Sequence, residues 1–150
     1  MRTFGENFTE DVKVDRFHLD EENELQPSLY AFYADKMTDA KQDRDKAADT
    51  LKFITATRDI HYRRNPPDDV KTTEKVFDDL VTTDTEVVQA TEELRRTEKV
   101  LNTITNALSS VDQRRSSLNN LTELYVKNYY TSKQNDFADV MNDRLNGRDK

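Results

Sequence analysis

The scarcity of turn-forming residues constrains this chain more than any other feature of its sequence. The 150 residues include only 2 glycines and 3 prolines, which are Gly5, Pro27, Pro66, Pro67 and Gly147. A β-sandwich or an α/β fold needs many tight connections, and these are built largely from glycine, proline and other turn-tolerant residues. Two long stretches of the chain contain neither residue, so the sequence predicts an all-α protein made of long helices.

Hydrophobic residues are also few, at 34% of the chain against 35% charged residues. Ordinary globular domains are about 45–50% apolar on a count that includes glycine. Disorder would predict few aromatic residues, yet the chain contains 7 Phe and 6 Tyr. Long amphipathic helices account for both observations, because each needs only a narrow apolar stripe. We expect subunits of a homo-oligomer to share the rest of the core.

Residue types that carry catalysis or hold metals are scarce. The chain has no cysteine and only two isolated histidines, which argues against disulfides and the usual zinc sites. No glycine-rich phosphate loop, zinc-protease helix or nucleophile elbow occurs. Four aspartates near helical spacing could hold a divalent ion, but interleaved lysines make surface ion pairs the preferred interpretation; they are Asp35, Asp39, Asp43 and Asp49. We therefore expect no enzyme, no metal site and no cofactor.

Charge and hydropathy bear on location and partners. The net charge is −7, which favours solubility and argues against nucleic-acid binding by the whole surface. The acidic excess lies in residues 1–27 and 65–83, whereas residues 28–64 carry 8 basic and 6 acidic residues. No run approaches 18 apolar residues and no apolar signal core begins the chain, so we expect an intracellular protein that makes no contact with membranes.

The positions of the glycines and prolines, together with the charge pattern, divide the chain into three segments. Residues 1–27 are interpreted as an acidic flexible arm, which ends where Pro27 disfavours helix and Ser28 can cap one. Residues 28–131 are expected to form a helical oligomerisation and DNA-binding domain, with helices over 28–64, 72–83 and 84–131. Residues 132–150 form a polar tail with a weak helical signal. The predicted architecture is a long antiparallel helical hairpin with a short intervening helix.

An alternating spacing of three and four residues marks the faces on which these helices pack. It runs from Tyr30 to His61 and again from Val87 to Arg115, the pattern of a coiled-coil seam. After Arg115, the seam continues with one slip into an aromatic end. The candidate oligomerisation residues are Leu101, Ile104, Leu108, Leu118, Leu121, Leu124, Tyr125 and Tyr129.

Residues 57–66 concentrate cations at the end of the first long helix. The guanidinium group of arginine can donate two hydrogen bonds to phosphate oxygens, and the planar side chains of Tyr and Arg can stack on unpaired bases. Helix C-termini also attract cations, so capping and solvation remain an alternative interpretation. The candidate nucleic-acid-binding residues are Arg58, His61, Tyr62, Arg63 and Arg64.

Several short motifs, in order, resemble the UvsY-like recombination mediator family of bacteriophages. The resemblance covers about residues 24–132. It is carried by Gln26-Pro27-Ser28-Leu29-Tyr30, Arg44-Asp45-Lys46-Ala47, residues 60–66, Thr73-Glu74-Lys75-Val76, Arg114-Arg115, Leu124-Tyr125 and Asn128-Tyr129-Tyr130.

The resemblance implies an all-helical, non-catalytic protein of the host cell cytoplasm that forms a closed ring of roughly six to eight subunits. It implies binding to single-stranded DNA and help to a RecA-like recombinase that replaces the single-strand-binding protein. The family's basic segment falls on Arg58, Arg63 and Arg64, with Tyr62 as aromatic companion. This chain departs from the family in its acidity and in the Asn-Pro-Pro turn that follows the basic segment.

Two other functions are compatible with the sequence. A coiled-coil structural, assembly or adaptor protein of a phage would join subunits without retaining an oligonucleotide. An acidic decoy would use residues 1–27 to occupy a basic site on a partner. Fluorescence anisotropy with labelled single strands at two ionic strengths separates the adaptor from the mediator, and deletion of the arm tests the decoy.

Overall fold

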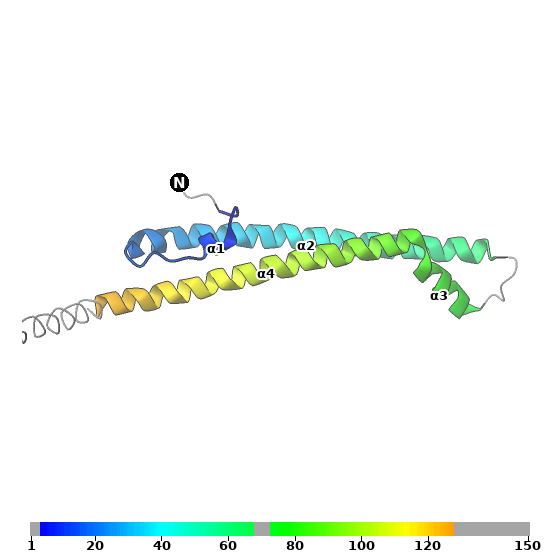
Figure 1. The fold of residues 1–150 in the computed structure, drawn as a ribbon. Helices are drawn as coiled ribbons and strands as arrows, with labels where there is room; N and C mark the ends of the chain where they lie inside the picture. Colours follow the sequence, from blue (N-terminus) through cyan, green and yellow to red (C-terminus); the bar gives the residue numbers. More distant parts are fainter. Residues whose placement is uncertain (1–3, 68–72, 128–150) are drawn as a thin grey trace, which may run out of the picture. The chain divides into compact units, whose positions relative to one another are not determined.

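The computed structural model describes residues 4–67 and 73–127, and this part of the chain is all-α (Figure 1). Its elements are α1 (Phe8–Asp11), α2 (Leu19–Arg64), α3 (Glu74–Thr83) and α4 (Thr85–Val126). No strand occurs among the described residues. The all-α prediction, with two long helices and a short one between them, is therefore confirmed; positions 128–150, which include the tail, lie outside the described residues.

The chain divides into two compact units, to which α2 and α4 both contribute. The terminal unit comprises Met1–Ala31 and Ser109–Lys150, and the central unit comprises Phe32–Leu108. In the terminal unit Gln26 of α2 lies beside Val111 of α4, and Asn23 lies beside Thr122. In the central unit, Tyr62 near the end of α2 lies beside Asp84, which caps the start of α4. The two helices run antiparallel within each unit.

The prediction that the first long helix begins at Ser28 is wrong, because α2 begins at Leu19 and Pro27 lies inside it. A proline there cannot donate to the carbonyl four residues earlier, which normally weakens a helix. The buried side of α2 nevertheless continues through Glu22, Gln26, Leu29 and Tyr33. Because two of these four residues are polar, their helical spacing does not form a hydrophobic pattern in the sequence.

The buried polar residues of α2 are held by one arginine of α4. The side chain of Arg114 donates to Glu22 and to Gln26, and it reaches the carbonyl oxygen of Lys13 at 3.4 Å. Glu22 in turn accepts a hydrogen bond from the backbone N–H of Asp15 at 3.2 Å. This network fastens the segment before α2 to both long helices, and the paired charges make their burial tolerable.

The seam of α4 follows the predicted spacing from Val87 to Leu118 except at Arg115. Arg115, which the spacing placed on the seam, is exposed, whereas Arg114 is only 4% exposed. Leu118 follows four residues later and is fully buried. The prediction for Arg115 is wrong because the side chain that is buried at this turn is that of Arg114, which is bonded to Glu22 and Gln26 of α2. The predicted seam also begins at the wrong residue in α2, where Leu29 is buried and Tyr30 is exposed.

The connection between α3 and α4 is a single residue with two roles. Asp84 ends α3 in an extended conformation and accepts a hydrogen bond from the backbone N–H of Glu86 at 2.8 Å. A carboxylate at this position satisfies an amide at the helix start that has no partner within the helix. The same side chain is therefore fixed in place next to the end of α2.

Among the described residues, no helix is long and apolar enough to cross a bilayer.

Candidate nucleic-acid interface

The predicted basic segment forms the last two turns of α2, in the central unit. The helical repeat distributes its five candidate residues around the helix rather than on one face. Arg58 and Tyr62 lie one turn apart and are partly buried, whereas His61 and Arg64 are exposed. The structure therefore does not bring the five side chains together as one patch.

Arg58 and Tyr62 contact the start of α4. The guanidinium of Arg58 pairs with Glu86 and lies 3.5 Å from a carboxylate oxygen of Asp84. The hydroxyl of Tyr62 donates to the other oxygen of Asp84 at 2.8 Å. That hydrogen bond, helped by desolvation, raises the pKa of Tyr62. The tyrosine is thus neutral at physiological pH and serves to dock α2 against α4.

Arg63 contacts α3. Its two terminal nitrogens donate to the two oxygens of Glu74 at 3.0 and 2.7 Å, and its Nε donates to Asp59 at 2.9 Å. The guanidinium also lies 5.2 Å from the centre of the Phe77 ring, within reach of a cation–π interaction. The bond to Arg63 lowers the pKa of Glu74, and the two carboxylates raise the pKa of Arg63.

Arg64, like Arg63, is an exposed cation of the segment. Unlike Arg58 and Arg63, it forms no ion pair with another described residue. His61 is exposed as well, and its ring meets that of Tyr62 edge to face with 5.5 Å between centroids. Arg64 can therefore meet a phosphate without first giving up a carboxylate.

Acidic side chains compensate the predicted basic segment. Two of its three arginines, Arg58 and Arg63, pair with four carboxylates from three helices or their caps, namely Asp59, Glu74, Asp84 and Glu86. Sequence reasoning missed these partners. The spacing from Asp59 to Arg63 is a readable i,i+4 signal, but Glu74 and Glu86 come from other helices, and no local pattern indicated which arginine they would meet.

The outer face of α2 carries a second feature that sequence reasoning missed. Phe53 is 73% exposed and Ile60 is 50% exposed, seven residues apart on the same side of the helix. Both residues fall outside the predicted seam. This position is itself the sequence signal that could have identified them, because a large apolar residue outside the seam of an amphipathic helix has no packing partner within the hairpin.

The candidate oligomerisation residues occupy different environments. Leu118 is fully buried within the terminal unit. Leu101, Ile104, Leu108, Leu121 and Leu124 are partly buried, Tyr125 is 67% exposed, and Tyr129 lies outside the described residues. Leu118 thus packs within its own subunit, whereas Tyr125 at the end of α4 can make contacts elsewhere.

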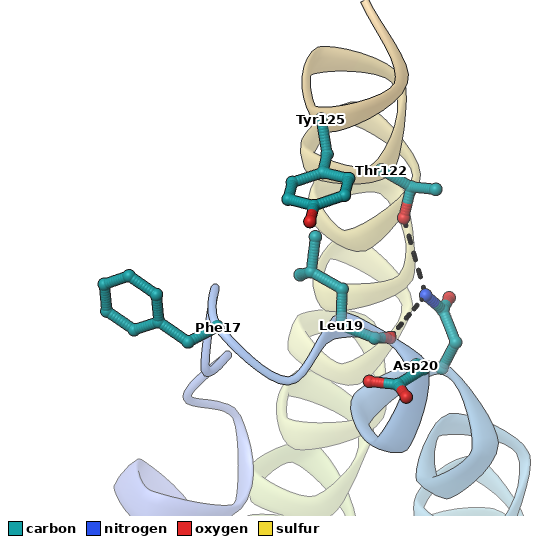
Figure 2. A pocket seen from close by; sticks show the side chains of 6 residues that line it. Phe17, Leu19, Asp20, Thr122 and Tyr125 are labelled. Atoms are coloured by element: carbon teal, nitrogen blue, oxygen red, sulfur yellow. Dashed lines mark hydrogen bonds between the residues drawn. The ribbon is translucent and has the colours of Figure 1, made fainter. Parts of the chain in front are cut away.

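Tyr125 lines an open cavity of about 420 Å³ in the terminal unit. Figure 2 shows Tyr125 and Thr122 of α4 facing Leu19 and Asp20 at the start of α2, with the ring of Phe17 set apart from them. Asn23 bridges the two helices by donating to the hydroxyl of Thr122 at 3.5 Å and to the carbonyl of Leu19 at 2.7 Å. The described residues that line the cavity include no convergent set of catalytic groups.

The aspartates of α2 are arranged as surface charges. Asp43 pairs with Lys46 at 3.6 Å, and Asp49 pairs with Lys52 at 3.7 Å. No cluster of three or more potential metal ligands occurs in the part of the chain that the structure describes.

Comparison with known proteins identifies the family. Residues 7–128 match the protein family described as "Recombination, repair and ssDNA binding protein UvsY". The match covers most of the chain, including both long helices and the basic segment at the end of α2. This chain belongs to the UvsY family.

Solved structures of the UvsY family share its fold. The crystal structure of the bacteriophage T4 recombination mediator protein UvsY in lattice type IV is similar with a TM-score of 0.69 at 16% identity, over 79% of this chain and 90% of that one. The lattice type I structure is similar with a TM-score of 0.68 at 17% identity, over 79% of this chain and 93% of that one. No curated protein sequence matches. The fold of the UvsY family therefore persists in a chain that shares few of its residues.

Proposed function

We propose that this chain is a phage recombination mediator without catalytic activity of its own. In this role it binds single-stranded DNA as a homo-oligomeric ring, in the host cytoplasm, and assists the loading of a RecA-like recombinase in exchange for single-strand-binding protein. The observation that carries the proposal is the family match over residues 7–128. The structural likeness to the T4 recombination mediator supports it at the level of the fold.

The proposed binding mechanism begins at Arg64. Arg64 is exposed at the end of α2, where its guanidinium can donate two parallel, charge-assisted hydrogen bonds to phosphate oxygens. Arg58 and Arg63 contribute only when phosphate oxygens displace the carboxylates of α3 and α4. One subunit alone offers too few cations for tight binding, but a ring repeats the site and raises the number of phosphates neutralised.

The acidic groups next to Arg58 and Arg63 reduce the positive charge that the proposed ring offers to DNA. The carboxylates next to Arg58 and Arg63 lower the positive potential at each site, so intrinsic affinity is modest and salt-sensitive. Modest affinity suits a protein that must hold a strand and then release it to another. Residues 1–27, with their 8 acidic and 3 basic residues, are proposed to remain off the strand because of charge repulsion.

The test is charge reversal at the exposed cation. Arg64→Glu should weaken binding of a labelled oligonucleotide by at least about tenfold at low salt, since each lost phosphate contact is multiplied around an oligomer. Arg95→Glu is the matched control, because Arg95 is exposed in the same unit and is likewise without an ion pair among the described residues. Fluorescence anisotropy at two ionic strengths measures the affinity, and light scattering confirms an unchanged molecular mass.

The outcomes separate the proposal from its competitor. Equal losses in Arg64→Glu and Arg95→Glu would mean that affinity follows net charge rather than the end of α2. Absence of binding by the unmodified protein at low salt would overturn the mediator function and favour a coiled-coil assembly or adaptor protein of a phage.

A further inference from the structure

The outer face of α2 in the central unit carries an aromatic side chain without an internal partner. Phe53 is 73% exposed, the highest value among the large hydrophobic residues of the described part of this unit, and Ile60 is 50% exposed. The other large hydrophobic residues that are exposed in the described part of the unit are Val88 and Val100 of α4, which are aliphatic and less exposed. A phenylalanine this exposed gains nothing from folding of the single chain.

The helical repeat places Phe53 in line with the exposed cation. Phe53, Thr57, Ile60 and Arg64 follow one another at steps of four, three and four residues, which puts them on one face of the helix. All four are exposed. At about 1.5 Å per residue, Phe53 and Arg64 lie roughly 16 Å apart along the helix. Arg58 and Tyr62 lie on the opposite side, where they dock against α4.

Charge near Phe53 favours an anionic partner. Lys52 is adjacent and exposed, and its ammonium lies 3.7 Å from a carboxylate oxygen of Asp49, with both side chains about 80% exposed. Exposed pairs of this kind are worth little and exchange readily. Arg64 lies on the face of Phe53, and Lys52 lies next to Phe53 about 100° around the helix. An exposed ring with cations on either side of it along the helix is the combination that holds an unpaired nucleic-acid strand.

The size of the face argues against a protein partner. A stable interface buries about 800 Å² on each side, whereas an aromatic side chain buries about 150–250 Å². One phenylalanine and one isoleucine, separated by Thr57 and bordered by charged residues, fall well short of that. A single base stacked on Phe53 needs no larger area.

We infer that Phe53 is a base-stacking residue for single-stranded DNA, whose strand follows the outer face of α2 with its phosphates on Lys52 and Arg64. This inference rests on the proposed function and adds a contact to bases that the basic segment alone does not provide. Stacking on a phenyl ring is tolerant of sequence, so the contact distinguishes unpaired from paired strands without selecting a sequence.

The absence of tryptophan from the chain makes a direct test available. In Phe53→Trp the new indole is the only one in the protein, and a base that stacks on it should quench its fluorescence. An oligonucleotide with bases should quench it, and an abasic strand of equal length and charge should not. Val100→Trp is the matched control, because Val100 is also exposed in the central unit but lies on α4.

Affinity measurements complete the test. Phe53→Leu keeps an apolar side chain but removes the ring, so it should weaken binding to the normal strand by at least about fivefold and leave binding to the abasic strand unchanged. Equal weakening on both strands, or none on either, would overturn the stacking inference while the mediator function stands. A fall in molecular mass by light scattering in Phe53→Leu would instead assign the residue to a subunit contact. Failure of the unmodified protein to bind either strand would remove the proposed function itself.

Discussion

At the scale of single residues, two adjacent arginines of α4 show how position decides a side chain's role. Arg114 is buried and bonded to Glu22 and Gln26, whereas Arg115 is exposed and pairs only with Asp112 at 3.0 Å. A buried ion pair gains little over well-packed apolar side chains, but removal of one partner leaves an uncompensated buried charge. The two residues should therefore differ sharply in their contribution to stability.

We expect Arg114→Ala to lower the free energy of unfolding by about 3–5 kcal/mol, because the carboxylate of Glu22 then stays buried without its cation. Arg115→Ala, the matched control one residue away, should change it by less than about 0.5 kcal/mol. Urea denaturation followed by circular dichroism measures both. Similar effects of the two substitutions would show that the network around Arg114 does not hold the terminal unit together.

At the scale of elements, the carboxylates of α3 and α4 restrain the arginines of α2. Arg63 lowers the pKa of Glu74, so this pairing is complete above the ordinary glutamate pKa of 4.5 and is lost only as the pH falls through the lowered value. At neutral pH the restraint is therefore fully present. Phosphate competition or removal of the carboxylates can release it, whereas mild acidification cannot.

Neutralising those carboxylates should improve binding. We expect Glu74→Gln and Glu86→Gln each to raise the affinity for single-stranded DNA by about two- to fivefold, the range of an exposed ion pair that no longer competes with phosphate. Glu93→Gln is the control, since Glu93 holds Arg96 on α4 in the same way, with a shortest contact of 2.6 Å, and bears the same charge change. Anisotropy titration at fixed salt measures the three variants. If Glu93→Gln gains as much, the effect comes from net charge and not from release of Arg58 and Arg63.

The elements also show how far sequence reasoning reaches. The helix ending at Arg64, the short helix near residue 74 and the helix starting after Asp84 follow from local caps and breakers, and the structure confirms them. The start of α2 does not follow, because burial of Glu22 and Gln26 depends on Arg114, which lies more than 85 residues away. The basic segment was readable from the sequence, but its neutralisation by Glu74 and Glu86 was not, since that is tertiary information.

At the scale of the whole molecule, the small core supports the proposed homo-oligomer, in which subunits would share apolar surfaces. The buried hydrophobic side chains of the described residues include small or polar-tipped members such as Ala40, Ala90 and Tyr33. Meanwhile Tyr125 and Val126 at the end of α4 are 67% and 73% exposed. Adjacent large apolar side chains at a helix end are expected to be covered by a second subunit.

The final prediction joins oligomerisation to binding. Tyr125→Glu should lower the molecular mass measured by light scattering, because a charge at a covered apolar position would have to be desolvated. Phe53→Leu should leave the mass unchanged. If avidity around a ring supplies most of the affinity, the smaller species should also show a shallower salt dependence. A plot of the logarithm of the binding constant against the logarithm of the salt concentration has a slope of about −0.7 for each phosphate neutralised on a single strand. A smaller oligomer neutralises fewer phosphates, so its slope should be less steep. A Tyr125→Glu protein of reduced mass with an unchanged salt slope would mean that one subunit holds the strand alone, and the repeated Arg64 sites would then have no cooperative role.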